Sequence, residues 1–336
     1  MRVGCLGYAT EQGLGMLMKS FFDAGVITDP MIWLHGHPSR PNHLEWYPSG
    51  TQTCRGHAAH LDLKGIDVML FFETPFDWSL PIRCKDRGIR TALVPMYEWT
   101  PRRPPSWFDV VICPSALDYD YFCMTSTVGF CYKCVHIPIP VRTDLWKPRT
   151  KALRFLHNAG HLGHREHKGT RQLLEAVKFI KSDAEITVRS QKDVNMVSLV
   201  YETKITSGRV QFQTDLPYEQ LWDGHDVYIA PEKFNGLSLP LQEARAAGMV
   251  VMTSDRYPHN TWLPKEPLIP VTGYGRVCIS QHYLEFDEAI IEPMVIAATI
   301  DSWYGRDISA ISESGRVWAE QNSWPALKDR WLEALS

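Results

Sequence analysis

The chain has 336 residues, of which 44% are hydrophobic and 22% charged, a mixture typical of a globular protein large enough for two α/β domains. Its 35 lysines and arginines are outnumbered by 38 aspartates and glutamates. The composition therefore does not favour a non-specific nucleic-acid-binding protein, and any binding of nucleic acid would need a local basic patch. No apolar run reaches the roughly 18 residues that a membrane span needs.

The opening stretch, Met1–Gly7, is expected to form a first strand, because its apolar run is too short for a signal peptide. Eight cysteines are scattered along the chain without a disulfide framework, in a protein large enough to fold without one. These features favour a reduced, cytoplasmic protein.

The first half of the chain alternates between strand and helix patterns. The loop Thr10–Gly15 separates the first strand from a helix whose apolar residues recur with helical spacing as far as Phe22. Further strands are expected at Met31–Leu34, Asp67–Phe72, Thr91–Pro95 and Asp109–Cys113. The last three are almost continuously apolar, as buried parallel strands are. Repeated strand, crossover and parallel strand predict a doubly wound sheet.

The Pro-rich segment 137–148 is the best candidate for a linker, and the alternation restarts after it. The expected strands are Leu153–His157, Glu185–Arg189, Val210–Phe212, Asp226–Ala230 and Met249–Thr253, with helices at Thr170–Lys181 and Leu241–Ala247. The tail from Glu313 to Leu335 has a helical pattern. We therefore expect one Rossmann-like domain at 1–148, a second at 149–315, and a terminal helix at 316–336 that returns to the first domain. Ligands of such sheets bind at the carboxyl ends of the strands.

The segment Asp226–Asp255 has the most specific pattern in the chain: strand, loop, helix, glycine and strand. The loop around Gly236 lets backbone N–H groups approach a ligand at the N-terminal end of a helix, where the helix dipole favours anions. Glu243 lies about two turns further on and can accept hydrogen bonds from sugar or ribose hydroxyls.

This segment resembles the donor-binding signature of the large retaining GT-B glycosyltransferase family, whose members have two Rossmann-like domains facing a cleft. By this resemblance, Gly236, Leu237 and Ser238 match the loop over the transferred sugar and its distal phosphate, and Glu243 matches the glutamate that holds the donor ribose. The family's first glutamate is replaced here by Asn235, which carries no charge and puts the identity of the donor sugar in doubt. Glu232 is a less favoured substitute for it.

A second match begins at His157 and ends at Thr170, after a strand and before a helix. The resemblance assigns Lys168 to the donor diphosphate, whereas the family's arginine position is occupied by His161, and Arg165 is a second candidate for the missing charge. Such cations stabilise the negative charge of a departing diphosphate and replace a metal ion. The cluster of four histidines at 157, 161, 164 and 167 lacks a ligand set typical of zinc, so we expect no metal there.

The N-terminal half contains weaker matches. Gly13 and Gly15 occupy the place of the family's Gly-rich loop, which reaches toward the donor phosphates. Glu73 and Glu98 follow two expected strands and are candidate catalytic residues, together with His161 and Lys168. Asp118 and Asp120 resemble a metal-binding Asp-x-Asp pair, but their place favours a capped, solvated helix start. Cys131 and Cys134, near Cys123 and His136, are expected to be ordinary thiols.

The resemblance implies a metal-independent, retaining glycosyltransferase with a UDP- or GDP-sugar as donor substrate and no prosthetic group. The acceptor is open between a glycan or small metabolite and the hydroxymethylated base of a phage DNA duplex, which would have to be flipped out. Trp99, Arg102, Arg103 and Trp107 are the candidate acceptor contacts for that case. Two alternatives are a catalytically inactive binding protein of the same fold, since Asn235 and His161 weaken donor contacts, and a nucleotide-sugar epimerase.

Overall fold

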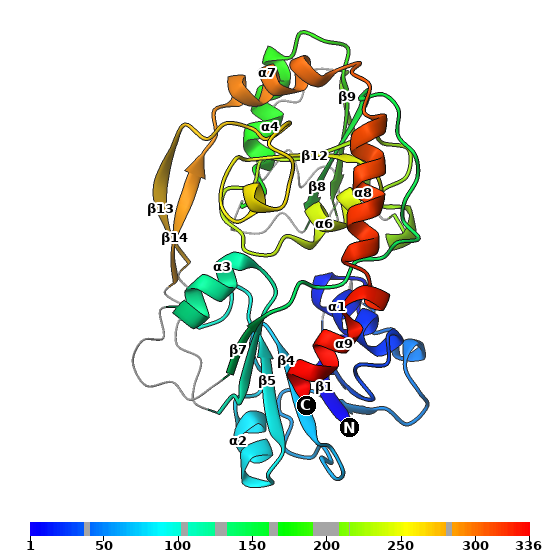
Figure 1. Ribbon diagram of the computed structural model, residues 1–336, viewed down its shortest axis with the longest axis vertical. Helices are drawn as coiled ribbons and strands as arrows, with labels where there is room; N and C mark the ends of the chain where they lie inside the picture. The colour runs from blue at the N-terminus through cyan, green and yellow to red at the C-terminus, as the bar shows by residue number, and fades with distance from the viewer. Residues whose placement is uncertain are drawn as a thin grey trace. The chain divides into compact units, whose positions relative to one another are not determined.

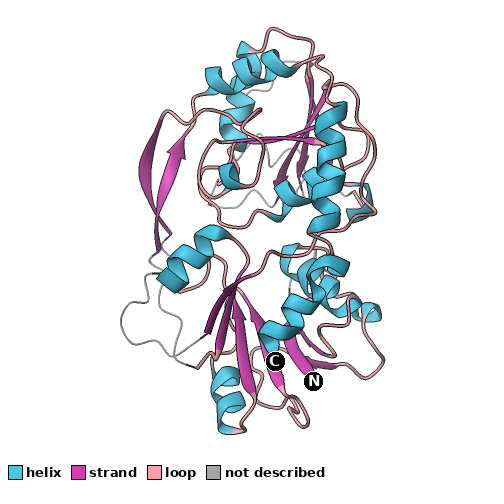
Figure 2. Cartoon of the chain, in the orientation of Figure 1, coloured by secondary structure: helices cyan, strands magenta, loops and turns pink. Residues whose placement is uncertain are grey.

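The computed structural model spans the whole chain and describes residues 1–36, 41–101, 107–124, 133–160, 167–190, 208–214, 216–279 and 284–336. It divides into two compact units, each of α/β architecture (Figures 1 and 2). Unit 1 comprises Met1–Pro140 and Trp324–Ser336, and unit 2 comprises Val141–Ser323. In the described part of the chain, no helix has both the length and the apolar character needed to cross a membrane.

Unit 1 is built on a seven-stranded sheet of order β3-β2-β1-β4-β5-β6-β7, in which neighbouring strands pair in parallel. The strands are β1 (Val3–Gly7), β2 (Asp29–Trp33), β3 (Gln52–Cys54), β4 (Val68–Phe72), β5 (Arg90–Val94), β6 (Val110–Cys113) and β7 (Lys133–His136). All five residues of β4 are buried, because helices and loops cover both faces of a parallel sheet. The strand order changes direction between β1 and β4, which is where ligands of doubly wound sheets bind.

The helices of unit 1 are α1 (Gly13–Asp23), η1 (Leu44–Trp46), α2 (Ser79–Asp86), α3 (Ala116–Tyr119), the π-helix η2 (Asp120–Met124) and α9 (Trp324–Leu335). Helix α9, at the end of the chain, lies beside α1 (Figure 1). The ring of Phe21 contacts those of Trp324 and Trp331 edge-on, both at 4.7 Å between centroids. Trp331 is fully buried and donates its indole N–H to the backbone oxygen of Pro138 at 3.2 Å.

The tail that the sequence pattern presents as one helix is two helices in the structure. Helix α8 (Ser309–Gln321) belongs to unit 2 and α9 to unit 1. Pro325, the second residue of α9, has no N–H to continue the hydrogen-bond ladder of α8, so it ends one helix and suits the start of the next.

Unit 2 contains a five-stranded parallel sheet of order β10-β9-β8-β11-β12 and an antiparallel pair β13-β14. The strands are β8 (Arg154–Gly160), β9 (Glu185–Ser190), β10 (Val210–Thr214), β11 (Val227–Ala230), β12 (Val250–Thr253), β13 (Gly273–Ile279) and β14 (Leu284–Ile290). The helices are α4 (Thr170–Ala176), η3 (Val177–Phe179), η4 (Tyr218–Gln220), α6 (Leu239–Ala246), η5 (His259–Thr261), α7 (Pro293–Trp303) and α8. The helix expected over Thr170–Lys181 is therefore an α-helix that tightens into a 3₁₀ turn.

One cysteine pair departs from the expectation of reduced thiols. Cys123, in η2, and Cys134, in β7, form a disulfide with 5.9 Å between their Cα atoms. The pairing depends on η2 lying over the edge of the sheet that β7 forms, which the spacing of the cysteines in the sequence does not reveal.

Candidate functional site

The loop between β11 and α6 holds itself in place through its own polar side chains. The backbone N–H of Ser238 donates to Oδ1 of Asn235 at 3.1 Å, and its hydroxyl donates to Oε1 of Glu232 at 2.7 Å. Ser238 has a positive φ of 45°, a conformation that is uncommon for a residue other than glycine. Backbone strain of this kind persists only where the surroundings enforce it, and it concentrates at ligand sites. Asn235 thus shapes the loop at the start of α6.

The side chain of Glu232 is the buried carboxylate of this loop, and only 1% of the residue's surface is exposed. Its Oε2 lies 4.0 Å from a guanidinium nitrogen of Arg256 and 3.8 Å from Nε2 of His259. Burial raises the pKa of Glu232, whereas Arg256, Ser238 and Lys168 oppose the rise. Burial and Arg256 hold the pKa of His259 well below its usual value, so that imidazole is neutral. The Glu232 carboxylate therefore lies among Ser238, Arg256 and His259, an arrangement that the sequence did not indicate.

Arg256 was not anticipated from the sequence. It follows β12 and donates from Nε to the backbone oxygen of Glu232 at 3.0 Å and from Nη2 to that of Asn235 at 3.1 Å. Its side chain is buried, so a full positive charge lies directly beneath the loop that precedes α6. The signal for it was the polar run Ser254–Arg256 directly after an apolar strand, at the edge of the sheet where ligands bind.

Lys168 reaches the same region from the loop after the neighbouring strand β8. A Cβ added at Gly160, the last residue of β8, would lie 2.9 Å from its Nζ. Burial lowers the pKa of Lys168, and the carboxylate of Glu232 counteracts this. Gly169 has a φ of 71°, and a Cβ there would lie 2.1 Å from the backbone oxygen of Pro231. Only glycine therefore lets the loop after β8 pack against the loop after β11. The structure thus gathers Lys168, Glu232 and Arg256 at the carboxyl ends of β8, β11 and β12.

His157 is a structural residue beneath these loops. It is fully buried, its Nδ1 lies 2.8 Å from the backbone oxygen of Ile229 and its Nε2 lies 2.7 Å from the hydroxyl of Thr170. Since a carbonyl only accepts, Nδ1 donates and Nε2 accepts the hydroxyl proton. Burial lowers the pKa of His157 to about 4, so the ring is neutral. Its two nitrogens are therefore engaged, which removes it from a histidine metal site. His161, His164 and Arg165 lie outside the described residues.

Glu243 lies on α6 and is only partly exposed. Its Oε1 accepts a hydrogen bond from the hydroxyl of Tyr218, and Gln242, next to it, donates to the backbone oxygen of Leu237 at 3.0 Å. Burial raises the pKa of Glu243 to about 7, against the lowering effects of Tyr218 and Arg142. The hydrogen bond from Tyr218 uses one of the two carboxylate oxygens.

The Gly-rich loop of unit 1 ends at α1. Gly15 packs against the backbone of Thr10 so closely that a Cβ would lie 2.1 Å from its oxygen. Gly13, the first residue of α1, has no neighbour among the described residues within 4 Å of such a Cβ. Gly15 therefore fixes the loop, whereas Gly13 is not in close contact with the described part of the chain.

Three carboxyl groups follow the neighbouring strands β4, β5 and β6. Burial and the charge of Glu98 raise the pKa of Glu73 to about 8, and Glu73 has a positive φ of 57°. Asp118 is fully buried, and burial raises its pKa to about 8 as well. The expectation of a capped helix start holds, because the hydroxyl of Ser115 accepts from the N–H of Asp118 at 3.1 Å. The expectation that Asp118 is solvated was wrong; Asp120 is exposed, so the pair faces two different environments.

The expected aromatic and basic acceptor loop is described only in part. Trp99 is 36% exposed, and Trp107 packs edge-on against Trp78 with 6.1 Å between ring centroids. Arg102 and Arg103 lie outside the described residues.

No protein-family model matches the chain, and no curated protein is significantly similar in sequence. Among solved structures, HepE from Anabaena in complex with UDP and glucose matches with a TM-score of 0.70 and 11% identity, over 100% of this chain and 99% of that one. A glycosyltransferase from Rickettsia africae ESF-5 matches with a TM-score of 0.68 and 13% identity, over 100% and 98%. Sucrose-phosphate synthase from Thermosynechococcus elongatus matches with a TM-score of 0.65 and 14% identity, over 100% of both chains.

These likenesses extend along the full chain at low identity, so what they establish is the fold. The protein has the GT-B fold, which confirms the α/β class with two Rossmann-like units.

Proposed function

We propose that the protein is a glycosyltransferase that moves a sugar from a nucleoside diphosphate sugar to an acceptor hydroxyl. The observation that carries this proposal is the cluster at the carboxyl edge of the unit 2 sheet, where Lys168 and Arg256 lie around Glu232 beneath the first turn of α6. Two cations and a helix N-terminus together form a binding place for a diphosphate.

The chemistry of the transfer suits these groups. When the bond between sugar and phosphate breaks, negative charge accumulates on the diphosphate, and cations fixed in advance stabilise that charge more than they stabilise the intact donor. A bound diphosphate would also raise the pKa of Lys168 and keep the ammonium charged. We therefore propose that Lys168 and Arg256 act where other transferases use a divalent metal ion.

Glu243 is proposed to hold the donor nucleoside. Its other carboxylate oxygen, Oε2, can accept hydrogen bonds from ribose hydroxyls, and Tyr218 fixes the orientation of the carboxylate. The loop Gly236–Ser238 would cover the sugar and its phosphate. HepE in its complex with UDP and glucose provides a precedent for UDP binding on this fold, so we propose UDP as the nucleotide, with GDP as the alternative.

We further propose that the anomeric configuration is retained. In a front-face reaction the leaving phosphate takes the proton of the acceptor hydroxyl, so the protein needs no strong base. Glu73 and Glu98 are then proposed to bind sugar hydroxyls rather than to abstract a proton. Since the pKa of Glu73 is raised to about 8, its carboxyl group can both donate and accept hydrogen bonds at neutral pH.

The acceptor is proposed to be a hydroxyl of a glycan or small metabolite. The exposed ring of Trp99 offers a surface on which a sugar or a base can stack. The net charge of −3 favours a small acceptor over duplex DNA, because DNA would need a concentrated basic patch.

The test is a panel of UDP- and GDP-sugars with sugar and metabolite acceptors, followed by mass-shift detection of the product. Transfer should fall in Lys168→Ala and persist in Lys178→Ala, which changes an exposed lysine of η3. Donor binding without transfer or hydrolysis across the panel would favour an inactive binding protein. Interconversion of free nucleotide sugars without acceptor would favour an epimerase.

A further inference from the structure

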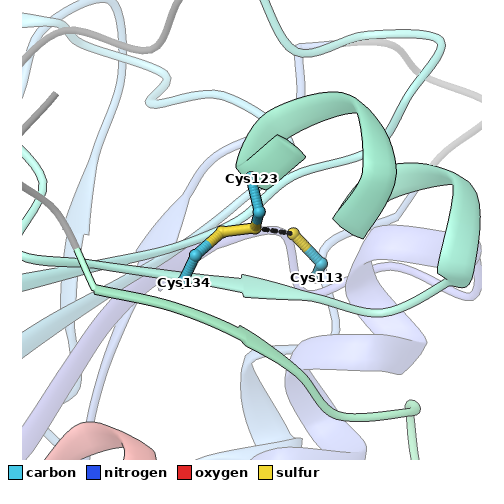
Figure 3. The surroundings of a disulfide bond; sticks show 3 residues. All are labelled: Cys113, Cys123 and Cys134. Atoms are coloured by element: carbon cyan, nitrogen blue, oxygen red, sulfur yellow. Dashed lines mark hydrogen bonds between the residues drawn. A yellow bond between two sulfur atoms is a disulfide. The ribbon is translucent and has the colours of Figure 1, made fainter. Parts of the chain in front are cut away.

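Three cysteine sulfurs meet at one edge of the unit 1 sheet (Figure 3). Cys113 ends β6, Cys123 lies in η2, and Cys134 lies in β7. The three sulfur atoms lie within 4.8 Å of one another, and that of Cys113 is 3.6 Å from that of Cys123. Cys113 is buried and the other two are partly exposed, so the cluster is within reach of solutes. A disulfide uses two of these sulfurs and leaves the third beside it.

The backbone sets this arrangement. In the parallel pairing of β6 with β7, Val111 is opposite Cys134 and Cys113 is opposite His136. Since alternate residues of a strand share a face, Cys113 and Cys134 project from the same face of the sheet. The helix η2 packs over that face and contributes Cys123, whose neighbour Phe122 belongs to the same apolar core as Cys113. The three positions are thus held by separate elements of the fold.

The disulfide between Cys123 and Cys134 can be reduced, whereas the other described cysteines are already free thiols. Cys5, Cys54 and Cys84 are buried free thiols, and Cys278 is an exposed one. Disulfides are rare in proteins of reducing compartments. There a cellular dithiol would supply two electrons and two protons to the bond between Cys123 and Cys134, become a disulfide itself and leave two thiols. The cluster would then contain three neighbouring thiols, those of Cys113, Cys123 and Cys134.

We propose that in the reduced protein Cys113, Cys123 and Cys134 bind one zinc ion as thiolates, with a fourth position open to water or another ligand. Thiolate is a preferred ligand of zinc, and a Zn–S bond of about 2.3 Å in tetrahedral geometry separates two sulfurs by about 3.8 Å. The 3.6 Å between the sulfurs of Cys113 and Cys123 fits that spacing. The ion would fasten the edge strand β7 and the π-helix to β6, and it is independent of the proposed sugar transfer.

Binding must displace the thiol protons. Zinc affinity should therefore increase with pH as protons compete less well.

The experiment uses the full chain, reduced with a phosphine, freed of metal and titrated without oxygen with Co²⁺ and then Zn²⁺. One equivalent of Co²⁺ should give a sulfur-to-metal charge-transfer band that Zn²⁺ abolishes. Cys113→Ser should weaken binding by more than about 100-fold, beyond the usual loss for a residue outside the coordination shell. Cys278→Ser, which removes an exposed thiol of unit 2, should bind as the original protein does. Equal binding by Cys113→Ser would overturn the proposal.

A second measurement needs no substitution and therefore does not depend on the folding of a variant. In the reduced protein, Zn²⁺ should protect the partly exposed Cys123 and Cys134 from alkylation while Cys278 reacts at an unchanged rate. Protein in which Cys123 and Cys134 are bonded should bind no zinc at this place. Two results would overturn the proposal: alkylation of the cluster cysteines at the same rate with and without Zn²⁺, or equal zinc affinity of the oxidised and the reduced protein. Either result would show that the cluster is a free thiol beside a disulfide and binds no metal.

Discussion

Replacing Glu243 with alanine tests the donor site most directly, because the carboxylate is partly buried and anchored on one side. Tyr218 donates to Oε1, and Arg142 lowers the pKa of the carboxyl group, so the side chain is oriented before any ligand arrives. The alanine variant removes the proposed acceptor for the ribose hydroxyls. It also leaves the hydroxyl of Tyr218 without its present partner.

The expected loss follows from the charge on the acceptor. A hydrogen bond to a charged group contributes about 1.5–3 kcal/mol, which corresponds to a roughly 10- to 150-fold weaker donor affinity. The pH dependence has a definite sign. Since the pKa of Glu243 is raised to about 7, the carboxylate that accepts these bonds is present above that pH and lost below it. Donor affinity should therefore fall as the pH decreases from about 8 to 6, and Glu243→Ala should make this fall smaller.

Isothermal titration calorimetry with UDP and UDP-sugars measures both effects. Glu219→Ala is the matched control, because Glu219 is an exposed glutamate adjacent to Tyr218, and its removal should leave the affinity unchanged. The reasoning would be refuted by an affinity of Glu243→Ala within about twofold of the original, with an unchanged thermal unfolding curve.

Four further outcomes are expected. Lys168→Ala should lower the rate of transfer by about 10²-fold or more with little change in acceptor KM, whereas Lys178→Ala, in η3, should leave the rate unchanged. Equal rates for the two variants would exclude Lys168 from the reaction. Turnover should survive a short incubation with excess EDTA, and a loss that manganese reverses would contradict metal independence. Since the pKa of Asp118 is raised to about 8, the folded state holds its proton more tightly and stability should fall as pH rises from about 4 to 8. Asp118→Asn should make the loss of stability between pH 4 and pH 8 smaller, and each kcal/mol gained at pH 8 should raise the Tm by about 2–4 °C. An unchanged dependence of the Tm on pH would contradict a raised pKa of Asp118. If the acceptor is DNA, replacing Arg102 and Arg103 should reduce the number of counterions released on binding by about two, so the affinity should depend less on salt. If neither plain nor hydroxymethylated duplex DNA gives a gel shift with the protein, DNA is excluded as the acceptor.

The sequence by itself determined the class of fold and much of its layout. The continuous apolar run of Val68–Phe72 and the alternation around it predicted buried parallel strands, because such strands are covered on both faces. The pattern from Asp226 to Asp255 also predicted the loop at the start of α6, since glycine, serine and a following apolar helix are local signals. Local signals persist in the fold because they depend on residues a few positions apart.

The tertiary structure decided which polar side chains share a site. Glu232 and Arg256 are 24 residues apart, and Lys168 is further away still, so no local pattern connects them. Burial of Asp118 and the meeting of Cys113 with Cys123 and Cys134 likewise depend on elements that cover the sheet edge. The charge of a carboxyl group and the reactivity of a thiol depend on desolvation and on neighbouring charges, and both are set by which segments pack together in space.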